Sequence, residues 1–255
     1  MATQTQKIAL ITGGSRGLGR NTAESLAARG VDSVITYHSR AEEAQAVVTA
    51  IQAQGRKAVA LQLDAGAPKT FAGFAERLKK ALQNTWGRSS FDFLVNNAGI
   101  SHHAAFDKVT EEDLDSLYQV HFKGVFFLTQ KLLPLINDGG RVVMLSSGTT
   151  RIIYPGSGAY ASMKGAIETL TLYLAKELGL RRITVNSVAP GAIATDFSGG
   201  MVRDNPEVNK LVASMTALGR PGLPEDIGPM IASLLSEDNR WVNAQRIEVS
   251  GGMSI

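Results

Sequence analysis

The fold of this chain is decided by the stretch Lys7-Ile8-Ala9-Leu10-Ile11-Thr12-Gly13-Gly14-Ser15-Arg16-Gly17-Leu18-Gly19. Its first part, 7–11, is a short apolar strand, and a helical stretch to about Arg29 follows the glycines. Without side chains at 13, 17 and 19, the backbone can approach a pyrophosphate while the helix N-terminus offers free N–H groups to it. The spacing is Gly-x-x-x-Gly-x-Gly, and a glycine-rich turn can also be purely structural. Its place between a strand and a helix favours phosphate binding.

Strands and helices alternate along the rest of the chain. Further strands are expected at 33–37, 57–63, 91–95, 141–146, 183–188 and 246–249. Further helices are expected at 41–54, 69–84, 111–136 with a break at Pro134, 159–178 and 224–235. This alternation predicts an α/β fold with a doubly wound, parallel seven-stranded sheet flanked by helices on both faces. No composition shift marks a linker, so residues 1–255 are predicted to form a single domain, with a substrate-covering excursion at about 192–218.

Composition excludes several classes of protein. The 255 residues are 44% hydrophobic, and 26 Lys+Arg against 23 Asp+Glu leave a net charge of only +3. No basic block is interleaved with aromatic residues, so no nucleic acid is expected as a partner. The absence of cysteine excludes disulfides and thiolate sites. The polar start at 1–6 lacks an apolar signal core, and no apolar run approaches the ~18 residues of a membrane span. We therefore expect a cytoplasmic protein without a membrane partner.

A second stretch, Tyr160-Ala161-Ser162-Met163-Lys164, carries candidate chemistry. Residues four apart on a helix share a face, so Tyr160 and Lys164 are expected to point into the same space. An ammonium beside a phenol lowers the pKa of the phenol, which makes the tyrosine a usable proton donor or acceptor near neutrality. Ser147 follows a predicted strand and can converge with this pair where open α/β sheets bind ligands. Taken alone, the Tyr-x-x-x-Lys spacing also fits an ordinary surface pair.

The end of the second strand bears on the choice of dinucleotide. A carboxylate there would bind the adenine ribose hydroxyls and repel a 2′-phosphate. The sequence reads Tyr37-His38-Ser39-Arg40, with no acid, and Asp32 lies at the other end of the strand. Arg40 and Arg16 could both reach a 2′-phosphate, although Arg40 could instead cap a loop in solvent. The sequence favours NADP(H).

Together these motifs resemble those of the short-chain dehydrogenase/reductase family. They fall in order over nearly the whole chain: Thr12–Gly19, Asn96-Asn97-Ala98-Gly99, Ser147, Tyr160-x-x-x-Lys164 and Pro190-Gly191-Ala192-Ile193-Ala194-Thr195. The resemblance implies a Rossmann fold and NADP(H)-dependent hydride transfer to a carbonyl or from a secondary alcohol, as in carbonyl and 3-oxoacyl reductase-like members. It further implies that Tyr160 donates and accepts the proton, Ser147 polarises the substrate oxygen, and Lys164 lowers the tyrosine pKa and holds the nicotinamide ribose.

The resemblance also implies a set of cofactor contacts. Asp64 would lie near the adenine, Asn96 and Gly99 near the adenosine ribose, and Ile193 and Thr195 near the carboxamide. Asp64 closes the third predicted strand on the cofactor side of the sheet, where it could also act as a helix N-cap. The full set is Gly13, Ser15, Arg16, Gly17, Leu18, Gly19, His38, Ser39, Arg40, Asp64, Asn96, Ala98, Gly99, Tyr160, Lys164, Pro190, Gly191, Ile193 and Thr195.

Three histidines need separate interpretations. His121 stands where the family has the asparagine of its proton relay, on an inward stripe with Leu114, Leu117, Gly124 and Leu128. It is a candidate catalytic residue or a buried structural one. His102 and His103 are adjacent on a loop without nearby acids in sequence, so no metal site is expected.

The remaining expectations concern partners. A dinucleotide-sensing regulator without catalysis could use the same fold, but the complete set of Ser147, Tyr160 and Lys164 argues against it.

The helix at 159–178 is apolar around most of its surface, which predicts a second subunit and a homodimer or homotetramer. Apolar residues in the excursion, beside Arg203 and Lys210, suit a moderately apolar small carbonyl or alcohol whose identity stays open.

Overall fold

A computed structural model describes residues 6–255; residues 1–5, part of the polar start, lie outside the described residues. One parallel sheet has the strand order β3-β2-β1-β4-β5-β6-β7. The strands are β1 (Ile8–Ile11), β2 (Asp32–Tyr37), β3 (Ala58–Gln62), β4 (Phe91–Asn96), β5 (Ile136–Leu145), β6 (Thr184–Pro190) and β7 (Arg246–Val249). The predicted seven-stranded parallel α/β fold is confirmed.

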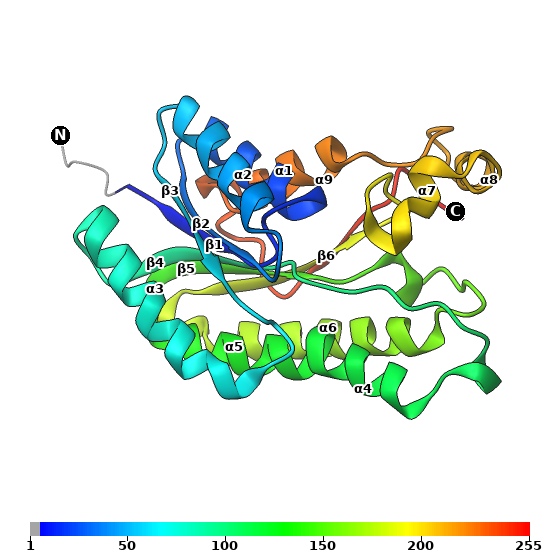
Figure 1. Cartoon of the computed structure of the whole chain (residues 1–255), viewed down its shortest axis with the longest axis horizontal. Coiled ribbons are helices and arrows are strands. Elements are labelled where there is room, and N and C mark those ends of the chain that lie inside the picture. The colour runs from blue at the N-terminus through cyan, green and yellow to red at the C-terminus, as the bar shows by residue number, and fades with distance from the viewer. Residues whose placement is uncertain (1–5) are drawn as a thin grey trace.

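Helices cover both faces of the sheet (Figure 1). On one face lie α1 (Gly17–Ala28), α2 (Ala41–Ala53) and α9 (Pro224–Leu234). On the other lie α3 (Phe71–Trp86), α4 (Glu111–Tyr118), α5 (Gly124–Leu132) and α6 (Gly158–Glu177). Beyond the carboxyl ends of the strands lie α7 (Met201–Asp204) and α8 (Pro206–Met215). Within residues 6–255, no helix has the length and hydropathy needed to span a lipid bilayer.

The apolar core has two layers, and β1 contributes to both. Side chains alternate along a strand, so Ile8 and Leu10 pack in the layer beneath α3, whereas Ala9 and Ile11 pack in the layer beneath α1. All four are fully buried. A strand enclosed on both faces needs a continuous apolar run, which is the pattern that the sequence shows at 8–11.

The strand order places a crevice above β1 and β4. The chain runs outward from β1 to β3, then crosses back to β4 on the other side of β1, so the connections from these two central strands diverge. Because all strands are parallel, their carboxyl ends meet at one edge. Ligands of open α/β sheets bind in this type of crevice. The glycine loop and the loops after β4, β5 and β6 all open onto it.

Two predicted elements differ from the structure. The expected helix at 111–136 is interrupted by a π-helical turn, Gln119–Lys123, before α5 begins. Gly124, which follows this turn, packs against the backbone of Ala65. A Cβ at position 124 would lie only 1.9 Å from the Ala65 carbonyl oxygen. Leu114, expected to face inward, leaves 42% of its surface exposed. The strand expected from residue 141 begins at Ile136, with a register shift against β4.

Candidate active site

The glycine loop needs its glycines for backbone reasons. Gly13 has φ of +64°, a left-handed conformation that favours glycine. A Cβ on Gly19 would lie only 2.3 Å from the Gly13 carbonyl oxygen, so α1 can pack on the loop only without a side chain there. The Gly13 amide donates to Thr36 Oγ1 of β2 at 3.2 Å. The loop is therefore closely packed and held in one shape.

Asn97 and Thr12, to which the sequence assigned no role, tie this loop to the end of β4. Thr12 Oγ1 accepts hydrogen bonds from the main-chain amides of Asn97 and Ala98, both at 2.9 Å. Asn97 Nδ2 donates to the carbonyls of Thr12 and Gly13 at 2.8 and 3.1 Å. The Asn96-Asn97-Ala98-Gly99 motif marked this segment as functional. The sequence could not show that the side chain of Asn97 supports the first loop.

The N-terminus of α1 can hold an anion. No side chain caps it, and no acidic residue lies in its first turn. The first N–H groups of a helix have no partner inside the helix, and the helix dipole favours negative charge there. Thr195 lies beside this end, because a Cβ on Gly17 would be 3.8 Å from Thr195. The structure thus fits the phosphates of a dinucleotide between the first loop and the segment after β6.

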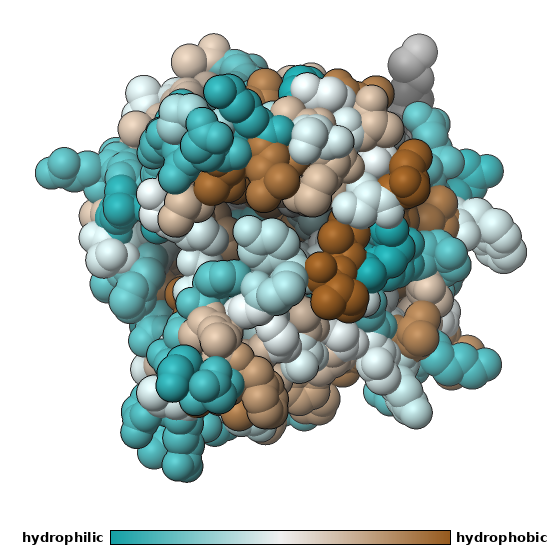
Figure 2. Space-filling view, turned by 90° about the vertical axis from the view of Figure 1, so that its right-hand side faces the viewer, coloured by the Kyte–Doolittle hydropathy of each residue, from teal (hydrophilic) through white to brown (hydrophobic). Residues whose placement is uncertain are grey.

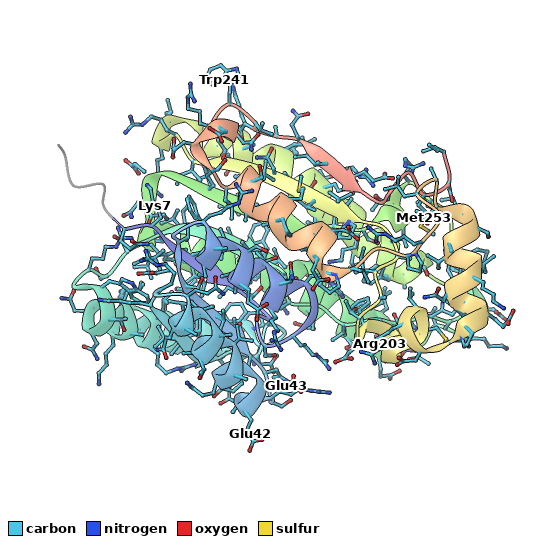
Figure 3. All side chains as sticks on the ribbon, turned by 90° about the horizontal axis from the view of Figure 1, so that it is seen from above. Lys7, Glu42, Glu43, Arg203, Trp241 and Met253 are labelled. Atoms are coloured by element: carbon cyan, nitrogen blue, oxygen red, sulfur yellow. The ribbon has the colours of Figure 1, made fainter. Side chains whose placement is uncertain are left out.

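Arginines gather where β2 ends. Arg16 pairs with Asp196 at 3.5 Å, and Arg40 pairs with Glu43 at the start of α2. Arg203 also binds Asp196 and is the main cause of the lowered pKa of that carboxyl, to which Arg16 and Arg40 add at longer range. Figure 3 shows Arg203 on the excursion and Glu43 at the start of α2, with both side chains at the molecular surface.

The nearby acids have other contacts. Asp32, at the far end of β2, accepts hydrogen bonds from the Lys57 amide and Trp86 Nε1, so it supports the core. Asp64 accepts from the Gly66 amide at 2.8 Å in a local turn and does not cap a helix. His38 Nε2 lies 3.8 Å from Asp64 Oδ2. His38, Ser39 and Asp64 are exposed at this end of the crevice, as a site for the adenosine half requires.

Asn96 was predicted to contact the cofactor, but its side chain points away from the crevice. Its side chain is buried, and Nδ2 donates to Thr129 Oγ1 at 3.0 Å. Only the main chain of Asn96 can therefore contact a ligand in the crevice.

The segment after β6 is held by main-chain pairing. The Ala194 amide donates to the Gly222 carbonyl at 2.9 Å, and the Gly222 amide donates to the Ala192 carbonyl at 3.0 Å. This pairing places Ile193 and Thr195 along the crevice, while Pro190 is buried in β6.

Ser147, Tyr160 and Lys164 meet at the end of the crevice beside β5. Lys164 Nζ lies 5.5 Å from the centre of the Tyr160 ring and donates to the Leu145 carbonyl at 2.7 Å. Ser147 Oγ accepts hydrogen bonds from the amide and the hydroxyl of Thr149 at 3.2 and 3.0 Å. Its own hydrogen is therefore left for the Tyr160 oxygen, with which Ser147 makes a hydrogen bond, or for a substrate oxygen. The surface-pair interpretation of Tyr160 and Lys164 is wrong, because Lys164 is only 5% exposed.

Burial shifts the pKa values of these groups in opposite directions. It raises the pKa of Tyr160 to about 12, an effect that a hydrogen bond with Ser147 partly opposes. It lowers the pKa of Lys164 to about 7, because a charged ammonium is costly in an apolar interior. The expected lowering of the tyrosine pKa is therefore not found in the chain by itself. Tyr160 keeps its proton at neutral pH, which is the state that a proton donor needs.

His121 lies in the π-helical turn and is 1% exposed. Its Nε2 is 2.7 Å from the carbonyl oxygen of Ile100 and 3.2 Å from the amide nitrogen of the same residue, and with a proton on Nε2 it donates to the carbonyl. The ring meets the Tyr160 ring edge-on, with centroids 5.1 Å apart and planes at 88°. Burial, followed by the charge of Lys164, lowers the pKa of His121 to about 3. The imidazole is thus neutral, and it connects Tyr160 to the turn after β4.

Apolar side chains surround the outer part of the crevice. Phe197 lies beside Tyr160, with ring centroids 6.2 Å apart, and His103 packs near Tyr154 at 5.6 Å. The Ala104 amide donates to the Gly156 carbonyl, which joins the two loops. Figure 2 views this end of the molecule, where hydrophobic patches alternate with polar ones. Exposed apolar residues on these segments include Ile100, Ile153, Tyr154, Phe197 and Met201.

The paired histidines do not form a metal centre in the structure. His102 Nδ1 lies 3.5 Å from Asp113 of α4, so an acid is close in space although distant in sequence. In the part of the chain that the structure describes, no three His, Asp or Glu side chains gather closely enough to hold a metal ion.

Comparisons with known proteins agree with this geometry. A family model described as enoyl-(acyl carrier protein) reductase matches residues 13–254. A short-chain dehydrogenase/reductase of Pestalotiopsis microspora is 35% identical, with 96% of this chain and 94% of the relative covered. The chain belongs to the short-chain dehydrogenase/reductase family. The predicted resemblance is confirmed.

Two further proteins similar to this chain are named as reductases. The hydroxynaphthalene reductase-like protein Arp2 of Metarhizium brunneum is 35% identical, over 96% of this chain and 94% of the relative. A crystal structure of the angucycline C-6 ketoreductase LanV with bound NADP superimposes with a TM-score of 0.92 at 37% identity, covering 97% of this chain and 95% of LanV. The family assignment and the fold are therefore consistent with a cofactor site in the crevice.

Proposed function

We propose that this chain is an NADP(H)-dependent oxidoreductase that interconverts a carbonyl compound and a secondary alcohol. The observation that carries the proposal is the convergence of Ser147, Tyr160 and Lys164 at the end of a crevice whose other end fits a dinucleotide. When bound, the nicotinamide supplies or accepts the hydride. The protein contributes position, proton transfer and electrostatic stabilisation.

Each catalytic side chain has a distinct task in the reduction. Ser147 donates its hydroxyl hydrogen to the substrate oxygen and stabilises the negative charge that develops there. Tyr160 holds a proton at neutral pH and delivers it to the same oxygen. Lys164, once protonated, favours the phenolate that Tyr160 leaves behind. His121 stays neutral and positions the Tyr160 ring, so its role is that of a structural substitute for the family's asparagine.

NADP(H) is the cofactor that the charge distribution favours. The first loop, the second strand and the excursion bring Arg16, Arg40 and Arg203 into one region, whereas the nearest acids are engaged in ion pairs. A 2′-phosphate would compete with Glu43 and Asp196 for these guanidinium groups. LanV, which was crystallised with NADP, supports the same choice.

A flat aromatic ketone is the substrate class that we favour. Phe197 provides aromatic surface beside the catalytic tyrosine, Tyr154 adds an exposed ring that packs near His103, and stacked rings stabilise one another beyond the burial of area. The names of Arp2 and LanV point to substrates with fused aromatic rings. The excursion at 192–218 would close over such a substrate through α7 and α8.

Assembly and location are further parts of the proposal. Exposed Phe126 and Phe127 on α5, and Leu172 and Tyr173 on α6, support a homodimer or homotetramer. Residues 1–255 would then form one dinucleotide-binding and catalytic domain per subunit. The cytoplasm, where NADPH is made available to reductases, is the expected location.

Oxidation of NADPH, followed with a panel of carbonyls, tests the function. The panel contains 1-tetralone as a fused aromatic ketone, 2-octanone as an aliphatic ketone, and an enoyl thioester. We expect turnover with both ketones, faster with the aromatic one, and no reduction of the enoyl thioester, which takes its hydride at the β-carbon rather than at the carbonyl carbon. Binding of NADPH without turnover of any substrate would favour the regulatory alternative.

A further inference from the structure

The loop that carries Ser147 is enclosed by an ion pair between α6 and β7. Glu168 follows Lys164 by four residues, so Tyr160, Lys164 and Glu168 share one face of α6. Oε1 of Glu168 accepts hydrogen bonds from Ser146 Oγ at 2.6 Å, from Thr150 Oγ1 at 2.8 Å and from Arg246 Nε at 2.7 Å. Two of these donors therefore flank Ser147 in the chain.

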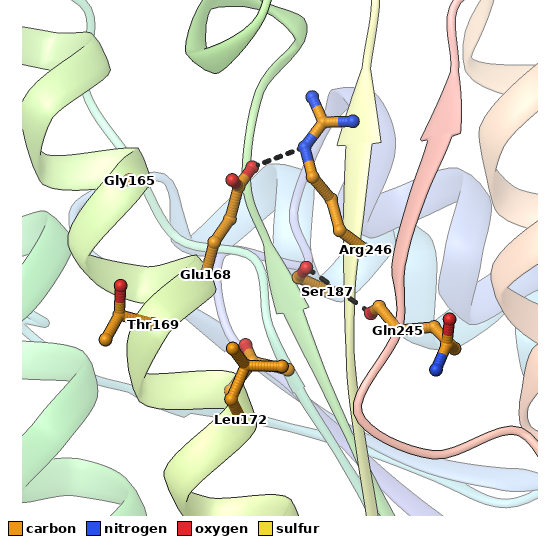
Figure 4. A pocket seen from close by; sticks show the side chains of 8 residues that line it. Gly165, Glu168, Thr169, Leu172, Ser187, Gln245 and Arg246 are labelled. Carbon is orange, nitrogen blue, oxygen red and sulfur yellow. Dashed lines mark hydrogen bonds and ion pairs between the residues drawn. The ribbon is translucent and has the colours of Figure 1, made fainter.

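Arg246 contacts the same loop from β7. Its Nη2 donates to Thr150 Oγ1 at 3.0 Å and to the main-chain carbonyl of Ser147 at 3.4 Å. Figure 4 shows the side chains of Arg246 and Glu168 joined to each other, and both line a pocket of about 310 Å³ between α6 and β7. Both side chains are about one-quarter exposed.

A second ion pair continues the network to the end of the chain. Arg246 Nη1 donates to Glu248 Oε2 at 3.1 Å, and Arg151 Nε donates to the same oxygen at 2.7 Å. Arg151 Nη2 also donates to the carbonyl of Met253 at 2.8 Å. Arg151 is the main cause of the lowered pKa of Glu248, about 2, so this carboxylate is charged at every pH at which the enzyme would work.

We infer that Glu168 and Arg246 are positioning residues that fix the Ser147 hydroxyl for catalysis. The inference rests on the proposed function. A hydrogen-bond donor stabilises a developing oxyanion only when its oxygen is held about 3 Å from that charge, and a displacement of ~1 Å at a reacting centre can lower a rate by ~10²-fold. Ser147 lies in a short loop between β5 and α6, and the bonds to its two flanking hydroxyls and its own carbonyl hold that loop.

A double-mutant cycle with Ser147 tests the inference. Arg246→Met should lower kcat roughly tenfold, with the Kd for NADPH and the folded state unchanged. In a Ser147→Ala background, followed over hours because it is slow, Arg246→Met should change kcat by less than about twofold, since no hydroxyl is left to position. Glu168→Gln keeps the accepting Oε1 and should retain kcat within about threefold, whereas Glu168→Leu should behave like Arg246→Met.

Arg181 offers a matched control at the opposite end of the sheet. Its guanidinium also combines an ion pair, with Asp138 at 2.8 Å, and hydrogen bonds to the main chain, at the carbonyls of Leu133 and Ile136. Arg181→Met should leave kcat unchanged in both backgrounds. An equal loss of kcat from Arg246→Met with and without the Ser147 hydroxyl contradicts the positioning role. A wild-type enzyme without turnover would instead contradict the proposed function, and the inference with it.

Discussion

At the catalytic end of the crevice Lys164 and His121 are buried, with 5% and 1% of their surfaces exposed, whereas at the other end Arg16 and Arg40 leave about half of their side chains in water. The groups at this end have strongly shifted pKa values: about 7 for Lys164, about 3 for His121 and about 12 for the half-buried Tyr160. The exposed arginines have only surface ion pairs, which contribute little to stability.

The contrast fits the tasks that we propose for the two ends. Proton transfer needs groups whose pKa values are shifted by desolvation and whose positions are fixed, so that end is buried. Recognition of a phosphate needs positive charge within reach, and long exposed side chains can supply it. We therefore expect substitutions at the buried end to change rates and stability strongly, and those at the exposed end to change mainly the cofactor preference.

The largest effect should come from Tyr160→Phe. Loss of the phenolic hydroxyl removes the proton donor, so kcat should fall by ~10²–10⁴-fold while the Kd for NADPH stays the same. Steady-state kinetics and fluorescence titration measure the two quantities. Tyr173→Phe, at a 65% exposed position on the same helix, is the matched control and should behave as wild type. Retention of more than about a hundredth of the wild-type rate by Tyr160→Phe would contradict the assigned role.

Lys164 should make stability depend on pH in the cofactor-free chain. Its folded pKa of about 7 is below the usual 10.5, so between these pH values the unfolded chain binds a proton that the folded chain does not. The free energy of unfolding should therefore rise with pH in this window, by a contribution on the order of a few kcal/mol.

Urea unfolding of wild type and Lys164→Met at pH 6.5, 8.0 and 9.5 measures this contribution. The rise should be smaller in Lys164→Met, which has no titrating group at this position, and unchanged in Lys176→Met, whose side chain is on the exposed face of the same helix. Parallel curves for wild type and Lys164→Met would show that burial does not shift the pKa of this lysine.

Arg40→Asp tests the exposed end. The wild type should bind NADPH at least tenfold tighter than NADH, a difference of ~1.4 kcal/mol. The aspartate removes a cation and adds an acid that can bind ribose hydroxyls, so the order should reverse. Arg20→Asp, on α1 in an ion pair with Glu24, controls for the change of net charge and should keep the wild-type preference. Equal affinities of the wild type for both cofactors would remove the argument for a 2′-phosphate site.

The smallest effect on activity is expected from His121→Asn. An amide has both a donor and an acceptor for the main chain of Ile100, so activity should stay within about tenfold. His121→Ala should mainly lose stability, ~1–3 kcal/mol, because the Ile100 carbonyl would be left without its buried partner. With a pKa of about 3, His121 contributes no titration between pH 5 and 9. If a limb near pH 6–7 in the wild-type rate profile disappears in His121→Asn, His121 titrates in catalysis.

The sequence by itself determined the order of elements, the parallel sheet and the shared face of Tyr160 and Lys164. This is local information: β1 is apolar on both faces, the glycines of the first loop come directly after it, and Tyr160 and Lys164 are one helical turn apart. Such features depend on neighbours a few residues away, and for this reason they can be read from spacing and residue type. The direction in which Asn96 points could not be read in this way, because its partner Thr129 is 33 residues further along the chain.

Only the tertiary structure decided how the candidate residues are surrounded. The sequence indicated that Lys164 would lower the pKa of Tyr160, but burial dominates and raises it, and burial depends on the packing of α6 against the rest of the site. The contact of His121 with Ile100 and the support of Ser147 by Arg246 likewise join segments 21 and 99 residues apart. Because solvation and hydrogen-bond partners are set by segments distant in sequence, the pKa values and the positioning network appear only when the chain is folded.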